Sequence, residues 1–197
     1  MATVQWPAVL RPSSMNLTLR SKTASFESPF SGTTQIVTYP GTRWAMDMRF
    51  ENLPPDEIRE MSVFLAQMDG PGGRVVLGDM SQPQSAPNGN PVTGIDTGNL
   101  VAVNSTGWVA SSLVLKRGQY VSISNQLRLV TADVTSDGNG AAQISLAPML
   151  RSKPQAGTHI EVQNPTGVFR LDKDENGGSR DPGLTGSFTI NLVEAFF

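Results

Sequence analysis

The clearest pattern of apolar and polar positions lies between Pro40 and Asp79. From Trp44 to Phe50 every second residue is large and apolar, and charged side chains stand between them. Residues are sorted with a period of two only when the chain is extended and one of its faces is buried. The sequence therefore predicts a strand whose buried face is formed by Trp44, Met46, Met48 and Phe50 and whose other face is formed by Arg43, Asp47 and Arg49.

An amphipathic helix is predicted directly after this strand. Its first turn contains Pro54 and Pro55, whose missing N–H groups are not needed there, followed by two acidic residues that suit a helix N-terminus. Gly70–Gly73 predicts the end of the helix, with a glycine in the left-handed capping conformation. A strand at Arg74–Leu77 follows, and no other long helix is expected. The apolar stripe of the helix is formed by Ile58, Met61, Leu65 and Met68.

Shorter segments precede this strand–helix–strand unit. They predict an extended segment at Trp6–Pro12, a strand at Met15–Arg20, and two strands, Ser25–Phe30 and Gln35–Tyr39, on either side of a turn at Ser31–Thr33. Because these segments follow one another closely, we expect them to form a compact half-domain together with the helix.

The chain ends on a long predicted strand, Gly186–Ala195, after a shorter strand at Gly167–Leu171 and a polar loop from Asp172 to Gly183. A strand of this length needs a sheet to join, and we expect the N-terminal half of the chain to provide it. Its two faces are formed by Phe188, Ile190 and Leu192 and by Thr189, Asn191 and Val193.

A change in composition separates the two halves. Met80–Gly98 is rich in Pro, Gly, Ser, Asn and Gln, which is typical of a linker. Turns are expected at Ser124–Gln126 and Asp137–Gly140. Five short strands are enough for a small barrel of the oligomer-binding (OB) type. They are predicted at Leu100–Val103, Gly118–Ile123, Leu127–Val130, Ala142–Leu146 and His159–Val162.

These elements predict a mainly β protein with two domains. A discontinuous β-sandwich domain with one α-helix would contain residues 1–82 and 164–197. An OB-like barrel, residues 83–163, would be inserted into it and would begin with a linker at 83–98. Glycine and proline are abundant (19 and 14 residues), which agrees with many short strands and chain reversals.

Charge and cysteine content narrow the possible partners. Charged residues make up 16% of the chain, against about 25% in ordinary soluble domains, which favours a surface partly covered by neighbouring subunits. The net charge of −2 gives no excess for binding a polyanion. The absence of cysteine excludes disulfides and thiolate metal sites. We expect neither a signal peptide nor a membrane span, because no long apolar run occurs.

The order of these parts resembles the distal tail proteins of long-tailed (siphovirus-type) bacteriophages. Four segments carry the resemblance: PGTRWAMDMRF at Pro40–Phe50, FLAQMDGPGGRVVLGD at Phe64–Asp79, SFTINLVEAF at Ser187–Phe196, and the run of small strands at Gly107–Val134. The last fits the OB-like barrel that is inserted into the β-sandwich "belt" domain in a subset of the family.

The resemblance implies a structural protein of the virion tail tip, or baseplate, and no enzyme activity. It implies a homohexameric ring that contacts the tail tube protein above and the hub or baseplate protein below, around a channel for DNA. Such a protein is assembled in the host cytoplasm. Neither a membrane nor a sequence-specific nucleic acid is an expected partner.

One segment partly matches a calcium-binding loop. Asp172–Gly177 supplies oxygen ligands at positions 1, 3 and 5 and a glycine at position 6. Gly183 replaces the glutamate required at position 12, and Arg180 places a cation at position 9. An exposed turn is therefore the better interpretation, and no metal site is predicted.

Two other motifs also have structural explanations. His159 is the only histidine, but no nucleophile motif accompanies it, and it lies in a predicted strand. Gly70–Gly73 lacks the Gly-Lys-Ser/Thr of a phosphate-binding loop and is expected to cap the helix. We therefore predict no catalytic and no cofactor-binding residue; a hydrolase is the least favoured class.

The predicted barrel contains few residues suited to a nucleic acid. Nucleic-acid-binding barrels combine a basic groove with aromatic stacking platforms. Here the large aromatic residues are Trp108 and Tyr120, and Trp108 fits a barrel core equally well. A carbohydrate- or receptor-binding module of a phage tail stays the alternative, since one tryptophan with polar loops can suffice. The barrel's basic residues are Lys116, Arg117, Arg128, Arg151 and Lys153.

Overall fold

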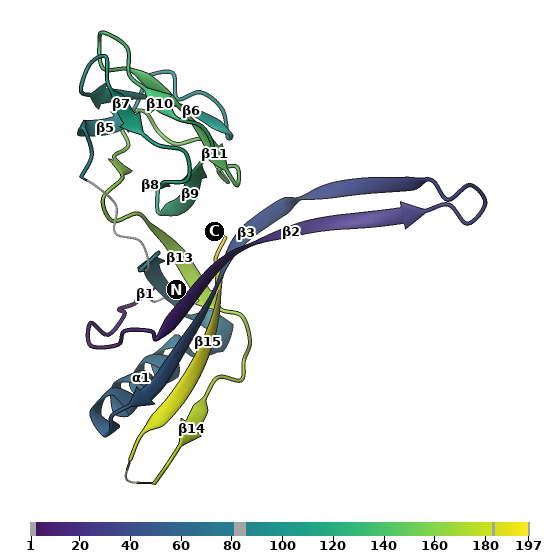
Figure 1. The fold of residues 1–197 in the computed structure, drawn as a ribbon, viewed down its shortest axis with the longest axis vertical. Coiled ribbons are helices and arrows are strands. Elements are labelled where there is room, and N and C mark those ends of the chain that lie inside the picture. Colours follow the sequence, from purple (N-terminus) through teal and green to yellow (C-terminus); the bar gives the residue numbers. More distant parts are fainter. Residues whose placement is uncertain (1–2, 81–85, 183, 197) are drawn as a thin grey trace.

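The computed structural model describes residues 3–80, 86–182 and 184–196. Two sheets and one α-helix account for most of the regular structure (Figure 1). The mainly β fold class with one α-helix and a barrel-like sheet, as predicted from the sequence, is confirmed.

The first sheet, which we call the belt sheet, has seven strands in the order β1-β4-β13-β15-β3-β2, with β14 also paired to β15. Only the β1–β4 pair in this part of the described chain is parallel. The last long strand, β15, pairs with β3, so the N-terminal half is its host, as expected. The strands are β1 (Thr3–Val4), β2 (Ser14–Glu27), β3 (Thr34–Leu53), β4 (Arg74–Gly78), β13 (Thr166–Leu171), β14 (Gly178–Arg180) and β15 (Gly186–Glu194).

One face of the belt sheet packs against the helix α1 (Pro55–Met68). The predicted buried face of β3 is confirmed: Trp44, Met46, Met48 and Phe50 are all buried. On β15 the face formed by Phe188, Ile190 and Leu192 is also buried, and Val193 on its other face is buried too. Val193 lies opposite Ala45 of β3, which is equally inaccessible, so both faces of the sheet are covered at this end.

The helix begins and ends close to the predicted residues. Pro55 is its first residue, and Met61, Phe64 and Met68 face the core. The predicted stripe omitted Phe64, whereas Ile58 and Leu65 are only partly buried. Asp69, rather than a glycine, takes the left-handed capping conformation, with φ 48° and ψ 55°. Among the described residues no helix is long and apolar enough to cross a membrane.

The N-terminal segment packs more tightly than an extended arm would. Leu10 is buried, and its N–H donates to the carbonyl of Pro7. The Trp6 ring lies 4.9 Å from the ring of Phe64 and 6.0 Å from that of Phe50. The short 3-10 helix η1 (Gly70–Gly72) then leads from α1 to β4.

The second sheet, which we call the barrel, has six strands in the order β12-β8-β9-β11-β6-β5. A single bridge between Val92 of β5 and His159, next to β12, links its two ends and nearly closes it. A separate pair, β7 with β10, lies beside it. The strands are β5 (Gly89–Thr93), β6 (Ala102–Trp108), β7 (Leu113–Leu115), β8 (Tyr120–Ile123), β9 (Gln126–Val130), β10 (Val134–Thr135), β11 (Ala142–Ala147) and β12 (Ile160–Glu161).

Both turns predicted in the barrel are present. Ser124 and Asn125 have positive φ values of 52° and 60°, as a tight turn between paired strands requires. The Asp137 carboxylate accepts hydrogen bonds from the N–H groups of Asn139 and Ala141. These bonds stabilise its charged form and lower the pKa of Asp137.

Two segments that were predicted to be irregular contain strands. Met80–Gly98 includes β5, whose Pro91 and Thr93 are buried, so this part is not a linker; residues 81–85 lie outside the described residues. The loop after Asp172 contains β14, which is three residues long and fully exposed. Neither strand has a run of apolar residues that would mark it in the sequence.

The chain leaves the belt sheet at the end of β4 and re-enters it at the start of β13. Gly78 and Thr166 are direct partners in the sheet, so these two points are adjacent. Each sheet has its own group of buried apolar residues. Among the described buried residues of the belt group, Leu127 alone comes from a barrel strand.

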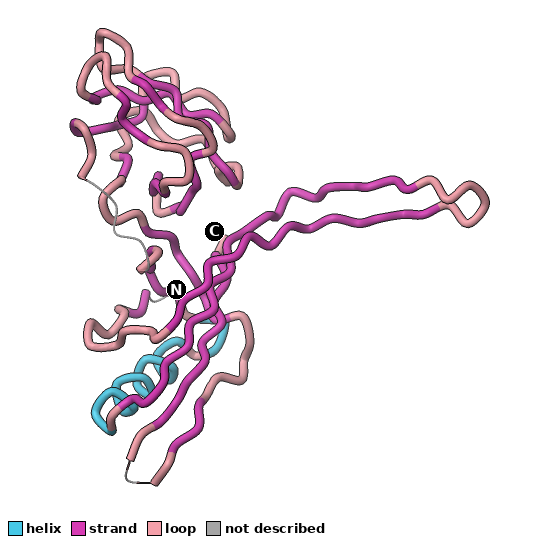
Figure 2. Tube along the Cα trace, viewed as in Figure 1, coloured by secondary structure: helices cyan, strands magenta, loops and turns pink. Residues whose placement is uncertain are grey.

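The N-terminal strands depart most from expectation. The two strands predicted at Ser25–Phe30 and Gln35–Tyr39 are the outer parts of β2 and β3 and do not pack into a compact half-domain. They form a long hairpin that projects from the belt sheet (Figures 1 and 2). The turn predicted at its tip is present, with Gly32 at φ 66°.

Candidate functional site

The projecting hairpin is the first candidate site, because it exposes apolar side chains and free strand edges that another surface could cover. We call its outer part, from Lys22 to Tyr39, the arm. The pairing of β2 with β3 shifts between Arg20 and Lys22 and then continues to Glu27 and Thr34. Beyond Trp44 neither strand has a further neighbour in the described sheet, so the arm is a two-stranded ribbon with both edges free.

The arm has one apolar face. Residues directly opposite each other on two antiparallel strands point to the same side. Ala24 pairs with Val37, and Phe26 and Tyr39 lie on the same side of the ribbon. The opposite side carries mainly hydroxyl side chains, together with Ile36 and Glu27.

Much of the apolar surface of the arm is exposed. Phe26 on the apolar face is 58% exposed, Ile36 on the opposite face 67%, and Phe30 at the tip 99%. In contrast, the apolar residues of β3 beyond Arg43 are buried. An exposed apolar surface of this kind on a two-stranded ribbon is typical of an interaction site.

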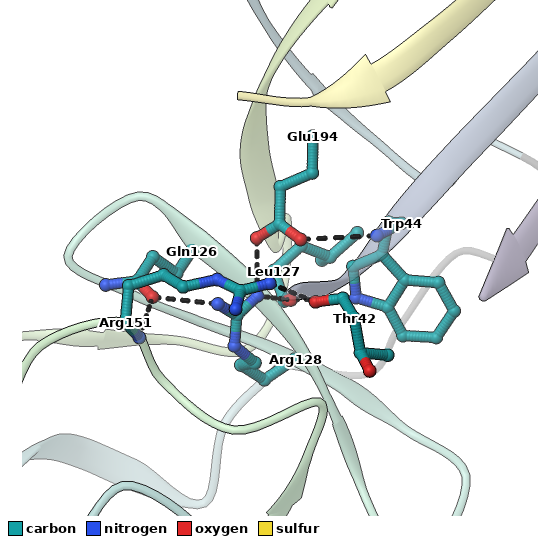
Figure 3. Close-up of polar contacts among 7 residues, drawn as sticks. All are labelled: Thr42, Trp44, Gln126, Leu127, Arg128, Arg151 and Glu194. Atoms are coloured by element: carbon teal, nitrogen blue, oxygen red, sulfur yellow. Dashed lines mark hydrogen bonds and ion pairs between the residues drawn. The ribbon is translucent and has the colours of Figure 1, made fainter. Parts of the chain in front are cut away.

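A second feature is the junction between the barrel and the belt sheet (Figure 3). Arg128 of β9 is completely buried, and its Nη1 donates to Oε1 of Glu194 on β15 at 2.6 Å. The other carboxylate oxygen of Glu194 accepts the backbone N–H of Trp44 at 3.2 Å. The Trp44 indole N–H donates to the carbonyl of Leu127 at 2.9 Å. Two belt strands and one barrel strand are thus joined by a buried ion pair and hydrogen bonds.

Polar and aromatic groups surround this ion pair. The side-chain oxygen of Gln126 accepts from Arg128 Nη2 at 2.8 Å and from the backbone N–H of Arg151 at 2.9 Å. Arg151 donates to the carbonyl of Thr42 and lies 3.8 Å from the centre of the Phe196 ring. Burial lowers the pKa of Arg151.

The calcium-loop candidate does not form a ligand cluster. Asp172 forms an ion pair with Arg20 at 2.7 Å, and the Asn176 amide donates to the carbonyl of Lys173. Arg180 donates to Ser62 on α1 at 2.7 Å. Among the described residues no group of three or more His, Cys, Asp or Glu side chains could hold a metal ion.

The remaining two motifs have structural positions. His159 forms the bridge that links the barrel ends, and its Nε2 lies 3.7 Å from a carboxylate oxygen of Glu161. Asp69, not Gly73, is the cap of α1; Gly73 follows the 3-10 helix in an extended conformation, and its N–H donates to the carbonyl of Met68 at 2.7 Å. A Cβ atom at Gly73 would come within 2.4 Å of that same carbonyl oxygen, so only glycine fits.

Several aromatic and basic residues of the barrel are buried or already in contact with other residues, so they are not available to bind a nucleic acid or a carbohydrate. Trp108 is buried, with its indole N–H donating to Ser105, so it offers no stacking platform. Tyr120 packs edge-on against Trp44 at 5.6 Å, and burial, with a smaller contribution from Asp79, raises its pKa. Arg128 and Arg151 belong to the junction. Lys116, Arg117 and Lys153 remain exposed.

Sequence reasoning did not identify the arm or the junction. The signal for the junction was a single charged residue within each of two otherwise apolar segments, at Arg128 and Glu194. The arm gave a weaker signal, because its alternating apolar residues match those of an ordinary core strand.

Comparison with protein-family models finds no match, and a search of curated proteins also finds none.

Proposed function

We propose that the protein is a structural subunit of the tail tip of a long-tailed bacteriophage and assembles there into a ring. Six copies, a central channel for DNA, and contacts with a tail tube protein above and a hub protein below are expected from the resemblance in the sequence. The function is mechanical and involves no catalysis. The observation that carries this proposal is the arm.

The arm cannot be explained by the stability of the single chain. It contributes no residue to either buried apolar group among the described residues. A two-stranded hairpin without such support is marginally stable in water at best. Its apolar face is stabilised if another surface covers it, and a neighbouring subunit provides such a surface in an assembly.

A protrusion on one side of a subunit also suits a ring. Cyclic assemblies with more than two subunits are built from head-to-tail contacts, in which one surface of a copy meets a different surface of the next. An arm that reaches to the next copy makes a contact of this kind. A permanent ring of this type buries roughly 2,000 Å² or more at each interface.

The proposal is tested by negative-stain electron microscopy and native mass spectrometry of the full-length protein. We expect rings of one size and a mass that is a fixed multiple of the subunit. Replacing Phe26 and Phe30 with serine should abolish them. Ile95, which is 99% exposed in the barrel, gives a matched control, and Ile95→Ser should leave the rings intact.

The result that would contradict this proposal is equally direct. A protein that remains monomeric at every concentration tested, with no rings on the grid, is not a self-assembling ring subunit. Rings that persist in the Phe26→Ser/Phe30→Ser variant would instead show that the arm does not hold them together.

A further inference from the structure

A groove on the opposite side of the molecule from the arm lies at the N-terminal segment. It has a volume of about 690 Å³, and its lining includes Trp6, Leu10, Arg11, Met15 and Met80. Figure 1 shows the N-terminal segment on one side of the belt sheet and the arm projecting from the other. We call this cavity the N-terminal groove.

The chemistry of the groove matches that of the arm tip. Methionine side chains adapt their shape to aromatic rings and make favourable sulfur–aromatic contacts. The groove offers Met15 and Met80 beside the Trp6 ring. The arm tip offers the rings of Phe26 and Phe30. An exposed aromatic side chain that enters an apolar pocket is the usual anchor of a protein interface.

The charges are also complementary. Glu27 is the single acidic residue between Arg20 and Tyr39, and it lies next to the tip of the arm. Arg11 lines the groove. Within the described part of the chain, neither side chain forms an ion pair or a hydrogen bond. Near the arm tip Glu27 and in the groove Arg11 thus carry charges of opposite sign that no described ion pair compensates; Lys22, the other charged residue of the arm, lies at its root over the Tyr39 ring.

We infer that the N-terminal groove is the docking site for the arm of a second copy of this chain. Phe30 and Phe26 occupy the apolar part of the groove, and Glu27 pairs with Arg11 at its rim. This inference rests on the proposed ring and names its contact. Because the arm and the groove lie on opposite sides of one subunit, each copy can hold one neighbour while it is held by another.

A second apolar groove competes for the arm. It has a volume of about 530 Å³ and is lined by residues at the root of the arm, such as Tyr39 and Pro40, and by Val101 and Met149 of the barrel part. It lies on the same side of the subunit as the arm. An arm docked there would join like sides of two copies, which favours a closed pair over a ring.

Disulfide trapping distinguishes these possibilities, because the chain has no cysteine of its own. One set of chains carries Ser31→Cys at the arm tip, and a differently tagged set carries Ala8→Cys at the N-terminal groove. The two sets are mixed under mild oxidation and the mixed disulfide is quantified. Val101→Cys tests the competing groove, and Ser179→Cys on the exposed strand β14 measures random collisions.

We expect the Ser31→Cys and Ala8→Cys chains to give the most mixed disulfide, several-fold above the Ser179→Cys background. Adding Phe30→Ser to the Ser31→Cys chain should bring the yield down to background. The two charge reversals, Glu27→Arg and Arg11→Glu, should each lower the yield when used alone. When they are combined on opposite chains, the yield should recover.

Three outcomes would overturn this inference: preferential trapping by Val101→Cys, preferential pairing of two Ser31→Cys chains, or a yield at Ala8→Cys no higher than background. The proposed ring is judged separately by electron microscopy. If rings form but no disulfide is trapped at Ala8→Cys, the proposed ring stands and the arm–groove contact is refuted. If the disulfide is trapped but no rings form, the contact stands and the proposed ring is refuted.

Discussion

At the scale of single residues, the junction depends on one buried ion pair. The side chains of Arg128 and Glu194 are 0% and 3% exposed, so both charged groups have lost their hydration. Burial of two charges is costly, and their attraction compensates for it only when further hydrogen bonds satisfy them. Glu194 meets this condition through the Trp44 N–H. Arg128 meets it in part, through Gln126 and the carbonyl of Leu127, while its buried Nε has no hydrogen-bond partner among the described residues.

We expect Glu194→Ala to lower the free energy of unfolding by about 3–5 kcal/mol, because it leaves Arg128 buried without a counter-charge. Urea denaturation followed by tryptophan fluorescence measures this change. The exposed pair Arg20–Asp172 supplies the control, and Asp172→Ala should cost less than about 1 kcal/mol.

The double variant Arg128→Met/Glu194→Leu separates the lost charge pair from lost packing. It should regain most of the stability lost in Glu194→Ala, since a buried ion pair can be replaced by apolar side chains of similar size. Equal costs for Glu194→Ala and Asp172→Ala would contradict the burial of the pair.

Trp44 connects the same junction to the belt core. Its ring is buried, and its indole N–H is bonded to the barrel. Trp44→Ala should therefore destabilise the protein by about 3–5 kcal/mol. Phe30→Ala, at the exposed tip of the arm, is the matched control and should leave the monomer's urea midpoint unchanged. An unchanged midpoint for Trp44→Ala would show that the side chain is exposed.

At the scale of elements, the sequence predicted those whose pattern reflects their own burial. The inner part of β3, the helix α1 and the strand β15 each bury one face within the chain, so their periodicity is visible in the residues. The arm was not predicted to project from the sheet, because the alternation of apolar and polar residues around Phe26 and Val37 resembles that of a strand with one face in the core. A pattern records that a face is apolar and does not say whether the covering surface belongs to the same chain.

The junction was unpredictable for a different reason. Arg128 and Glu194 are 66 residues apart, and the residues around each of them give no indication of which charged residue it pairs with. Their pairing exists only because the barrel sits at one end of the belt sheet. β5 and β14 escaped prediction because their residues carry almost no apolar signal: β5 (GNPVT) contains a glycine and a proline, and β14 (GSR) has no apolar side chain.

Removal of the arm tests whether it is independent of the fold. Lys22 and Tyr39 are direct partners, so the residues between them can be replaced by a two-residue Asn-Gly turn. We expect a folded protein whose stability is close to that of the full chain, because neither apolar core loses a residue. Analytical ultracentrifugation should show that assembly is lost. A cooperative loss of fold in this variant would mean that the arm is part of the core.

At the scale of the whole molecule, the barrel lies between two adjacent points of one sheet. Gly78 and Thr166 are partners in the belt sheet, although the barrel strands separate them in sequence. Insertions are tolerated at such places because the host's core does not depend on the inserted chain. The division into two domains predicted from the sequence stays a prediction that excision can test.

Replacing Pro83–Gln163 with a short Gly/Ser linker should leave a folded belt domain of lower stability. Its stability falls because Leu127 no longer covers the core and Glu194 loses Arg128. Adding Glu194→Leu to this fragment should recover part of the loss. The excised barrel, Asn99–Gln163, omits β5 and should be compared with a fragment that starts at Ala86.

Circular dichroism and the dispersion of amide-proton NMR signals report on all of these fragments. We expect dispersed spectra for the belt fragment and for the longer barrel fragment. A collapsed, poorly dispersed belt fragment would require the two-domain division to be withdrawn.

The position of β15 also determines the order in which the chain can fold during its synthesis. The barrel strands are contiguous in the chain and can pair as soon as they leave the ribosome. The belt sheet cannot, because β15 lies between β3 and β13 and is made last. Until then both neighbours present open edges and apolar side chains, which are prone to aggregation. A message truncated before the codon for Gly186 would therefore yield a finished barrel attached to a belt sheet that lacks its central strand.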